Sequence, residues 1–410
     1  GIYILSLSPS TAERRPPQES ANHPGLEQPS SIRYPPPFSS RRTIVLQDVL
    51  HYVCLRAVST PTLVCSIEDK GRPNLYKGEC CAWSALSPLV LRRKHSSIQA
   101  TVISKLDPGL RFQYVFGPNG LVLQDLWLKS SDVAESQAYN PEVHNGYHLF
   151  TRANPHISQP LPRGFGSVLS QSNYDPNKRT VVLVHGWQNL PTSEFNAVLV
   201  PAFLAADDVN VILTDWSIGA AGNYASAILN CIRSGESVAR YIGWLVAASG
   251  GDLSRFHLVG HSLGGHQAGI IGRSLGGVVP YITALDPALP GWITNSWRFQ
   301  ADDGQYTEVM HTNAGLQGFL TPLGDVDFYP NGGTNMPGCA DSSCSHHRCN
   351  FYMAESLGGG FVGRQCDSLN GALAGDCVGP TLNMGGLNPK LGRSGIFYVE
   401  TNAGPPFSIQ

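Results

Sequence analysis

The stretch Phe256-His257-Leu258-Val259-Gly260-His261-Ser262-Leu263-Gly264-Gly265 decides the fold of this chain. An apolar run ends at Gly260, and a helix-like run extends from Leu263 to Ser274. Between them lies G-x-S-x-G, with Ser262 at its centre. A serine at a sharp strand-to-helix turn has a strained backbone, which only small neighbours such as Gly260 and Gly264 permit. The pattern therefore predicts a nucleophilic hydroxyl at the start of a helix rather than an ordinary glycine-rich turn.

Further apolar runs alternate with helical segments on both sides of this turn. The runs that predict strands are 112–116, 121–127, 147–151, 180–184, 209–213, 256–259 and 281–285. Helices are predicted at 194–206, 235–248 and 263–274. Strands alternating with helices are typical of an α/β fold, with a mostly parallel central sheet covered by helices on both faces.

The two ends of the chain differ in character. Residues 1–100 begin with a segment rich in Pro, Ser and Arg that lacks hydrophobic periodicity. Such composition predicts a disordered or irregular N-terminal extension, of the kind that a propeptide forms. Residues 101–410 are predicted to form the folded domain.

Composition excludes several classes of protein. Charged residues make up 14% of the chain, the net charge is −2, and no basic stripe is visible, so nucleic acid is not expected as a partner. No run of apolar residues is long enough to predict a membrane-spanning helix. The close pairs Cys339/Cys344 and Cys366/Cys377 predict small disulfide-closed loops, and hence a secreted, extracellular protein.

A serine hydroxyl needs a base to take its proton and a third group to hold that base. Asp286 follows the predicted strand 281–285, one strand–helix–strand unit after Ser262. Working groups collect at the carboxyl ends of parallel strands, which favours Asp286 as the acid over a simple turn residue before Pro287. The chain order Ser, Asp, His would then be that of α/β-hydrolases.

Several histidines compete for the role of base. His346 and His347 lie together in Cys344-Ser345-His346-His347-Arg348-Cys349, a segment expected to form a loop, and both cannot point at Ser262. His311 closes an apolar run and is a second rival, or a buried structural histidine. The cysteines and histidines of the first cluster could instead hold a metal, but their spacing fits no familiar zinc pattern.

Two N–H donors are needed for the oxyanion. Leu263, directly after the nucleophile, can supply one. The other is expected from His185-Gly186-Trp187 at the end of an earlier strand, where Gly186 allows the Trp187 N–H to face the pocket.

At this point the chain resembles the pancreatic lipase family, most closely its secreted insect members, including the phospholipase A1-like ones. The resemblance runs from about Phe112 to Phe407. The motifs that carry it are Val-His-Gly-Trp at 184–187, Gly-His-Ser-Leu-Gly-Gly-His at 260–266, Leu-Asp-Pro-Ala at 285–288, Asp-Phe-Tyr-Pro-Asn-Gly-Gly at 327–333 and Cys-Ser-His-His-Arg at 344–348. The resemblance implies that Ser262 is the nucleophile, Asp286 the acid and His346 the base, with Trp187 and Leu263 as oxyanion donors.

Three departures from the family refine this expectation. Only 340–343 separate Cys339 from Cys344, where the family has a long lid, and such a short loop is found in phospholipase A1-like members. The chain stops where the family's catalytic domain ends, so neither a C-terminal β-sandwich nor a colipase partner is expected. Arg298 and Asp303 match the family's calcium pattern, but Asn295 and Gln300 stand where carboxylates belong. No metal and no cofactor is therefore predicted.

The sequence thus predicts a secreted carboxylic-ester hydrolase that acts on lipid at a membrane or micelle surface, through a Ser-His-Asp triad and an acyl-enzyme. Phospholipid is the first substrate hypothesis, and triacylglycerol or diacylglycerol the second. A hypothesis of another class is a non-catalytic lipid-binding protein on the same fold, as insect yolk proteins are. The presence of Ser262, Asp286 and His346 argues against it.

Overall fold

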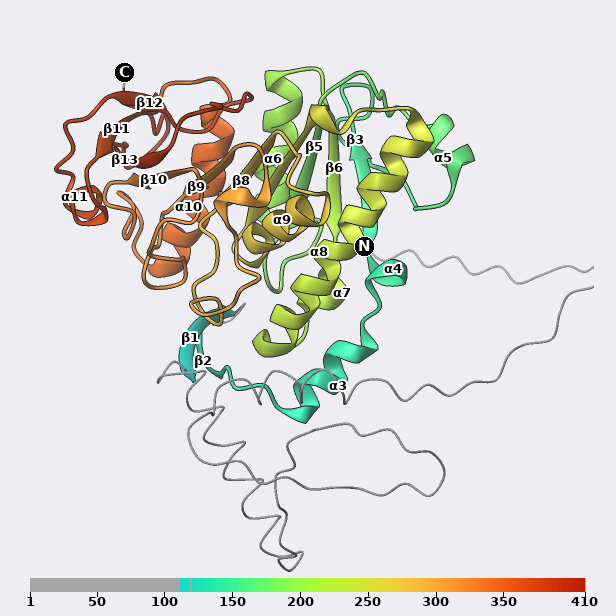
Figure 1. Cartoon of the computed structure of the whole chain (residues 1–410), viewed down its shortest axis with the longest axis horizontal. Helices are drawn as coiled ribbons and strands as arrows, with labels where there is room; N and C mark the ends of the chain where they lie inside the picture. The colour runs from blue at the N-terminus through green and yellow to red at the C-terminus, as the bar shows by residue number, and fades with distance from the viewer. Residues whose placement is uncertain (1–110, 118–119, 410) are drawn as a thin grey trace, which may run out of the picture. The chain divides into compact units, whose positions relative to one another are not determined.

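The computed structural model describes residues 111–117 and 120–409, all of which belong to the unit Ser87–Gln410. The prediction for residues 1–100, and the boundary at 100/101, lie outside the described residues. Figure 1 shows the described part as one large sheet with helices packed around it. No helix in this part is long and apolar enough to cross a membrane.

The sheet has parallel strands at its centre and antiparallel strands at both edges. Its order is β12-β11-β13-β10-β9-β8-β7-β5-β6-β3-β4. The run from β13 to β6 pairs in parallel, whereas β3, β4, β11 and β12 pair antiparallel. The strands are β3 (Gly146–Phe150), β4 (Gln159–Pro160), β5 (Thr180–Val184), β6 (Asn210–Asp215), β7 (Phe256–His261), β8 (Tyr281–Leu285), β9 (Thr307–Met310), β10 (Val326–Pro330), β11 (Val362–Cys366), β12 (Thr381–Asn383) and β13 (Gly395–Val399). The predicted mostly parallel α/β sheet is confirmed.

Helices cover the sheet and connect its strands. They are α3 (Ser130–Ala138), α4 (Pro141–His144), α5 (Gly166–Ser170), α6 (Glu194–Ala206), α7 (Ser217–Ala220), α8 (Tyr224–Ser249), α9 (Leu263–Ser274), α10 (Ser342–Ser356) and α11 (Leu369–Ala374), with short 3₁₀ turns at Leu253–Arg255 and Ala301–Asp303. The predicted helices 194–206 and 263–274 are confirmed residue for residue.

The central strands are apolar throughout because each face of the sheet carries its own core. In β5, Val182 and Val184 pack into the core formed with α8 and α9. Val181 and Leu183 point the other way, into the core formed with α6 and α10. Because successive side chains alternate across a strand, a strand covered on both faces must be continuously apolar.

The helix predicted at 235–248 is longer than expected, because α8 already begins at Tyr224. Its first part carries small and polar side chains, Ala225, Ser226 and Ala227 among them, and these are buried. Close packing against neighbouring elements explains this burial, whereas the apolar periodicity used for the prediction starts only near Gly235. The helix begins at Asn223, whose side chain accepts the Ser226 N–H (3.0 Å).

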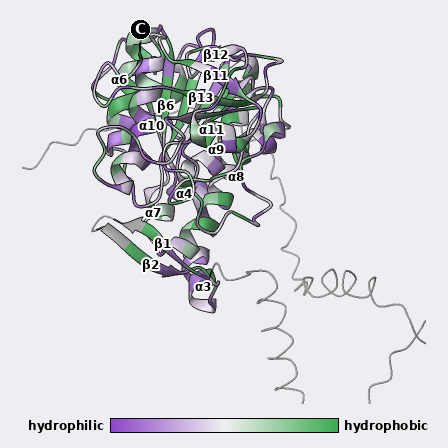
Figure 2. Ribbon diagram, turned by 90° about the vertical axis from the view of Figure 1, so that its left-hand side faces the viewer, coloured by the Kyte–Doolittle hydropathy of each residue, from purple (hydrophilic) through white to green (hydrophobic). Residues whose placement is uncertain are grey.

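A separate two-stranded hairpin precedes the sheet, β1 (Phe112–Gly117) and β2 (Gly120–Asp125). The strand predicted at 121–127 therefore starts one residue earlier and ends at Asp125. Figure 2 shows the hairpin standing out from the sheet with apolar residues along it. Val122 and Leu123 are exposed on β2, whereas Val115 on β1 is buried.

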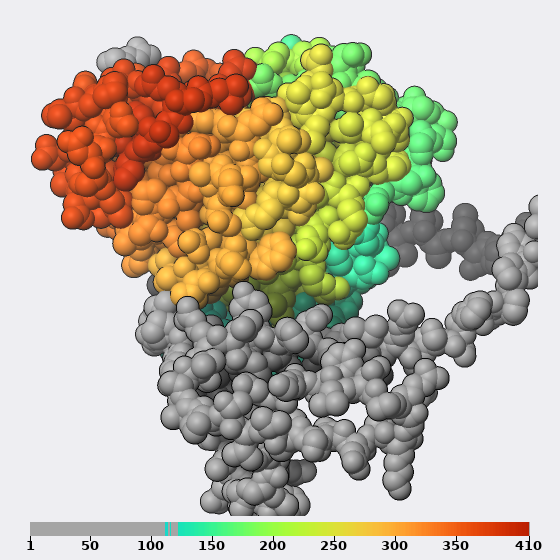
Figure 3. Space-filling model, in the orientation of Figure 1, coloured from blue at the N-terminus to red at the C-terminus, as the bar shows by residue number. Residues whose placement is uncertain are grey.

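The space-filling view shows where the successive segments of the chain lie on one face of the molecule. In Figure 3 the C-terminal segments, coloured red, gather at one end and the segments around α8 lie toward the other. The strand order places β9, β8, β7 and β5 in the middle of the sheet. The carboxyl ends of these strands define the edge where functional groups are expected.

Candidate active site

Ser262 lies at the turn between β7 and α9, with φ 58° and ψ −120°. A positive φ is uncommon for a residue with a side chain, and it persists only where the surroundings hold it. A Cβ on Gly260 would lie 1.9 Å from the Gly264 carbonyl oxygen, and one on Gly264 would lie 2.1 Å from that of Val184. Both positions therefore require glycine, as predicted, because the two arms of the turn pass at backbone contact.

Asp286 and His346 form a direct pair. The Nδ1–H of His346 donates to Oδ2 of Asp286 at 2.5 Å, and both side chains are buried. The other carboxylate oxygen, Oδ1, accepts the backbone N–H groups of Thr312 (2.8 Å) and Asn313 (2.9 Å). With Nδ1 occupied as a donor, Nε2 is the ring nitrogen that remains to accept a proton.

Gly318 allows this carboxylate to lie where it does. A Cβ at this position would lie 2.2 Å from Oδ1 and 2.5 Å from both Cγ and Oδ2 of Asp286. Real side chains do not approach so closely, so any larger residue would displace the carboxylate. Gly318 was not predicted, because nothing in the sequence indicates which glycine faces Asp286.

His346 lies on a helix, and the prediction that it lies on a loop is wrong. It occupies the second turn of α10, which starts after the N-cap residue Asp341. The Asp341 carboxylate accepts the Cys344 N–H at 2.8 Å. The sequence does not reveal this start because the N-cap Asp341 and the first helical residues lie inside the short loop that the Cys339–Cys344 disulfide closes, and a segment closed in this way is expected to form a loop.

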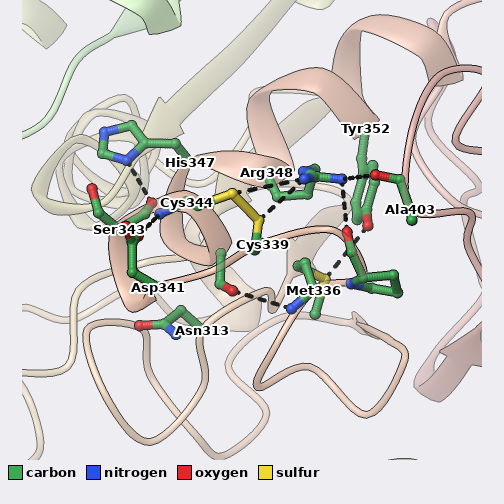
Figure 4. The surroundings of a disulfide bond; sticks show 12 residues. Asn313, Met336, Cys339, Asp341, Ser343, Cys344, His347, Arg348, Tyr352 and Ala403 are labelled. Atoms are coloured by element: carbon green, nitrogen blue, oxygen red, sulfur yellow. Dashed lines mark hydrogen bonds between the residues drawn. A yellow bond between two sulfur atoms is a disulfide. The ribbon is translucent and has the colours of Figure 1, made fainter.

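The predicted disulfides Cys339–Cys344 and Cys366–Cys377 are both present. Figure 4 shows the first of them beside the start of α10, next to the Arg348 guanidinium. Arg348 donates to the carbonyl oxygens of Pro337 (3.1 Å) and Ala403 (3.3 Å). These hydrogen bonds join the short loop and the C-terminal segment to the helix that carries His346.

A cavity of about 260 Å³ brings the predicted residues together, since Ser262, His346 and Trp187 all line it. Ser262 and His346 do not hydrogen bond to each other within the described part of the chain. Such catalytic hydrogen bonds are often long before substrate binds and shorten afterwards.

The predicted oxyanion donors, Trp187 and Leu263, have free N–H groups. Neither backbone N–H donates a hydrogen bond within residues 111–117 and 120–409. Leu263 is the first residue of α9, where backbone donors lack partners inside the helix. The Trp187 indole donates to the Gly222 carbonyl oxygen (2.9 Å) and packs edge-on against Tyr224, which fixes the loop after β5.

The other candidate histidines have partners that do not suit the role of base. His311 is buried and fully partnered, with Nδ1 at 2.8 Å from the Phe319 carbonyl oxygen and Nε2 at 2.8 Å from Oδ1 of Asp327. His347 lines the cavity, but its Nδ1–H donates to the Ser343 carbonyl oxygen at 2.9 Å rather than to a carboxylate. Of these histidines, only His346 pairs with Asp286.

The cavity also contains residues that were not predicted as part of the site, including His261 and Val115. His261, the residue before Ser262, donates its Nε2–H to the His346 carbonyl oxygen at 3.0 Å. Burial holds the pKa of His261 well below its usual range, so the ring is neutral and supports His346 without adding charge. Val115, from the β1–β2 hairpin, lines the same cavity. The motif contains His261, but no sequence signal connects Val115 with the site.

Two places in the domain were candidates for a metal ion. Cys339 and Cys344 are joined in a disulfide, which removes two ligands of the alternative metal cluster. At the position of the family's calcium, the Asp303 carboxylate is held by Arg273 (2.6 Å) and by the Gln300 N–H (2.8 Å). A carboxylate already paired with a guanidinium does not fit a calcium site. No cluster of metal-ligating side chains occurs among the described residues.

A strained serine after a central parallel strand, in one cavity with an imidazole–carboxylate pair, defines an α/β-hydrolase. Residues 128–403 match the Lipase family, and the chain belongs to that family. The β1–β2 hairpin, and with it Val115, lies upstream of the matched segment.

Relatives were found among both lipases and phospholipases. The chain is 31% identical to pancreatic triacylglycerol lipase of Homo sapiens over 58% of this chain and 57% of that protein. It is 32% identical to phospholipase A1 member A of Mus musculus over 56% of this chain and 53% of that protein. The chain thus spans a little over half the length of these relatives.

Solved structures with partial similarity include an esterase of Pyrobaculum calidifontis. The two are 15% identical, with a TM-score of 0.24 over 50% of this chain and 59% of that chain.

Proposed function

We propose that this protein is a lipid carboxylic-ester hydrolase in which Ser262 is the nucleophile, His346 the general base and Asp286 the acid. The observation that carries the proposal is the pairing of His346 with Asp286 in the cavity that also contains the strained Ser262. Membership of the Lipase family supports the same chemistry.

In the proposed mechanism, Oγ of Ser262 attacks the acyl carbonyl carbon while Nε2 of His346 takes its proton. The negative oxygen that forms is stabilised by the N–H groups of Trp187 and Leu263. The ester C–O bond then breaks, and the alcohol leaves with the proton from His346. Water, activated by His346, hydrolyses the acyl-enzyme and releases the fatty acid.

The hydrogen bonds of Asp286 explain how the base is held in one tautomer. Two backbone N–H groups fix Oδ1, so Oδ2 is the oxygen available to His346. The carboxylate stabilises the imidazolium that forms during attack. Neutral His261, whose ring centroid lies 4.7 Å from that of His346, adds no opposing charge.

We further propose phospholipase A1-type specificity in an extracellular setting. Only 340–343 lie between Cys339 and Cys344, so the loop beside His346 is too short to cover an acyl-chain groove. A short loop leaves room for a polar headgroup, which favours phospholipid over triacylglycerol. Triacylglycerol or diacylglycerol is the second candidate, supported by the relatives named as triacylglycerol lipases. Disulfides support the extracellular setting.

The test uses the purified full chain and phosphatidylcholine labelled in either acyl chain. We expect release of the sn-1 label, and loss of about 10⁶ in turnover for Ser262→Ala. Labelling by a fluorophosphonate should disappear in the same variant. Efficient cleavage of triolein without release from phosphatidylcholine would favour the second candidate. Equal fluorophosphonate labelling of wild type and Ser262→Ala would refute the assignment of the nucleophile.

A further inference from the structure

A second cavity adjoins the catalytic one. It has a volume of about 370 Å³ and is lined by Asn189, Ser193, Glu194, Ser343, Cys344 and His347. Asn189, Ser343 and His347 also line the catalytic cavity, so the two share a wall. We call the second one the side cavity. The side cavity therefore lies next to the space that a ligand at Ser262 would occupy.

The linings of the two cavities differ in chemistry. The catalytic cavity includes the apolar side chains of Val115, Trp187, Tyr224, Ala288 and Pro290. Apart from the Cys344 disulfide, the side cavity is lined by amide, hydroxyl, carboxylate and imidazole groups. An acyl chain placed there would leave these polar groups unpaired, which is unfavourable. The side cavity therefore suits the polar end of a substrate.

Glu194 is the charged residue of this lining. It is the first residue of α6 and forms no ion pair within the part of the chain that the structure describes. His347 is one of the residues that line both cavities. Its Nδ1–H donates to the Ser343 carbonyl oxygen. Burial lowers the pKa of His347, so the ring stays neutral near pH 7. Burial also raises the pKa of Glu194, against the opposing effect of the Asn350 amide. Glu194 is thus an exposed residue of this lining, and its carboxylate has no cationic neighbour there.

Two hydroxyl groups belong to the same lining, those of Ser193 and Ser343. Ser193 accepts the Leu190 N–H at 2.8 Å, which leaves its own O–H free to donate. Ser343 makes no side-chain hydrogen bond among the described residues and lines both cavities. The lining therefore offers hydroxyl donors together with the negative charge of Glu194, and Ser343 is shared with the cavity of Ser262.

We infer that the side cavity is the headgroup subsite for a zwitterionic phospholipid, with the ammonium group at Glu194 and the phosphate at the serine hydroxyls. This inference rests on the proposed function and names its substrate class. An anionic headgroup would meet the Glu194 carboxylate with like charge, and a neutral diacylglycerol would leave it unpaired.

The test measures kcat/KM for phosphatidylcholine, phosphatidylglycerol and diacylglycerol with the same acyl chains, in micelles of a neutral detergent at about 0.1 M salt. Glu194→Gln should lower the phosphatidylcholine-to-phosphatidylglycerol ratio about 2- to 5-fold, the range for one exposed ion pair. Glu194→Lys should lower it further and favour phosphatidylglycerol. The change should appear in KM rather than kcat, because the headgroup lies away from the reacting bond.

Glu400→Gln and Glu400→Lys are the matched controls, since Glu400 is exposed and lines neither cavity. They make the same change in net charge and so correct for general attraction to charged micelles. Ratios within one variant also cancel any loss of helix stability at the start of α6.

Ratios that stay equal to wild type in both Glu194 variants, or that change equally in the Glu400 controls, would overturn the subsite while leaving ester hydrolysis intact. Failure of wild type to cleave any of the three lipids would instead overturn the proposed function, and the subsite with it.

Discussion

Gly318→Ala tests whether the position of the Asp286 carboxylate controls the activity. The added Cβ would lie 2.2 Å from Oδ1 and 2.5 Å from Oδ2 of Asp286, where ordinary contact begins at 3.4 Å. The backbone at Gly318 accepts alanine, because its φ is not in the left-handed region. The clash can therefore be relieved only by the carboxylate, which must move away by about 1 Å. That retreat breaks the 2.5 Å hydrogen bond with His346 and the two bonds from Thr312 and Asn313.

The expected consequence is a loss in kcat of about 10²-fold for a misplacement of this size, and up to about 10⁴-fold if the His346 tautomer is lost. Overpacking should also cost about 1–3 kcal/mol in the free energy of unfolding. The assays are ester hydrolysis, with substrate saturating, and urea unfolding. Gly243→Ala is the control, because a Cβ on Gly243 meets nothing within 4 Å.

The double variant Gly318→Ala with Asp286→Ala separates the clash from other effects. Without the carboxylate the new methyl group has room, so Gly318→Ala should cost much less stability in the Asp286→Ala background. Unchanged kcat in the single variant, or an equal loss of stability in both backgrounds, would refute the reasoning.

Three further predictions concern other parts of the domain. Burial lowers the pKa of His266 from 6.5 to about 3, so the unfolded chain binds the extra proton first and stability falls as pH drops below 6.5. Between pH 8 and 5 this ring should cost about 2 kcal/mol, and urea unfolding of His266→Gln should show a correspondingly weaker pH dependence. Val115→Ala should raise KM for long-chain esters about fourfold for each methylene group of the acyl chain that is no longer buried, with little change for acetyl esters. Cys344→Ser should lower the free energy of unfolding by about 2 kcal/mol, because the loop that it opens is short.

Much of the fold could be predicted because the central strands are apolar on both faces. The runs at β5, β7 and β8, and the helices α6 and α9, follow directly from this pattern. The start of α8 could not be predicted, since its first turns bury small and polar side chains against distant elements. The edge strand β12 and its neighbour β11 carry no continuous apolar run, because one or both of their faces remain open.

The site was predictable to the extent that it depends on strand ends and short motifs. Ser262 follows from its motif and Asp286 from its place after β8. Choosing His346 over His347 required the family resemblance, because spacing cannot tell which imidazole meets a carboxylate. Gly318 and Val115 come from a loop and a hairpin whose approach to the site is decided by tertiary packing alone.

Strand order explains why this geometry is assembled at one edge of the sheet. The strands β5, β7, β8 and β9 are parallel neighbours, so their carboxyl ends lie side by side. They are followed by Trp187, Ser262, Asp286 and the Thr312 N–H, in that order. A shift of one strand against the next would separate these groups, since the Ser262 N–H is itself bonded to the Leu285 carbonyl oxygen (3.0 Å).

His346 differs, because it comes from α10 and not from a strand end. Its position therefore depends on how that helix is held. On one side the His346 carbonyl oxygen accepts from His261, and on the other Arg348 joins α10 to Pro337 and Ala403. These hydrogen bonds, together with the Cys339–Cys344 disulfide at the start of the helix, hold the part of α10 that carries the imidazole. The proposed base is thus placed by interactions that span the C-terminal half of the domain, so substitutions at Arg348 should weaken activity although Arg348 does not line the cavity.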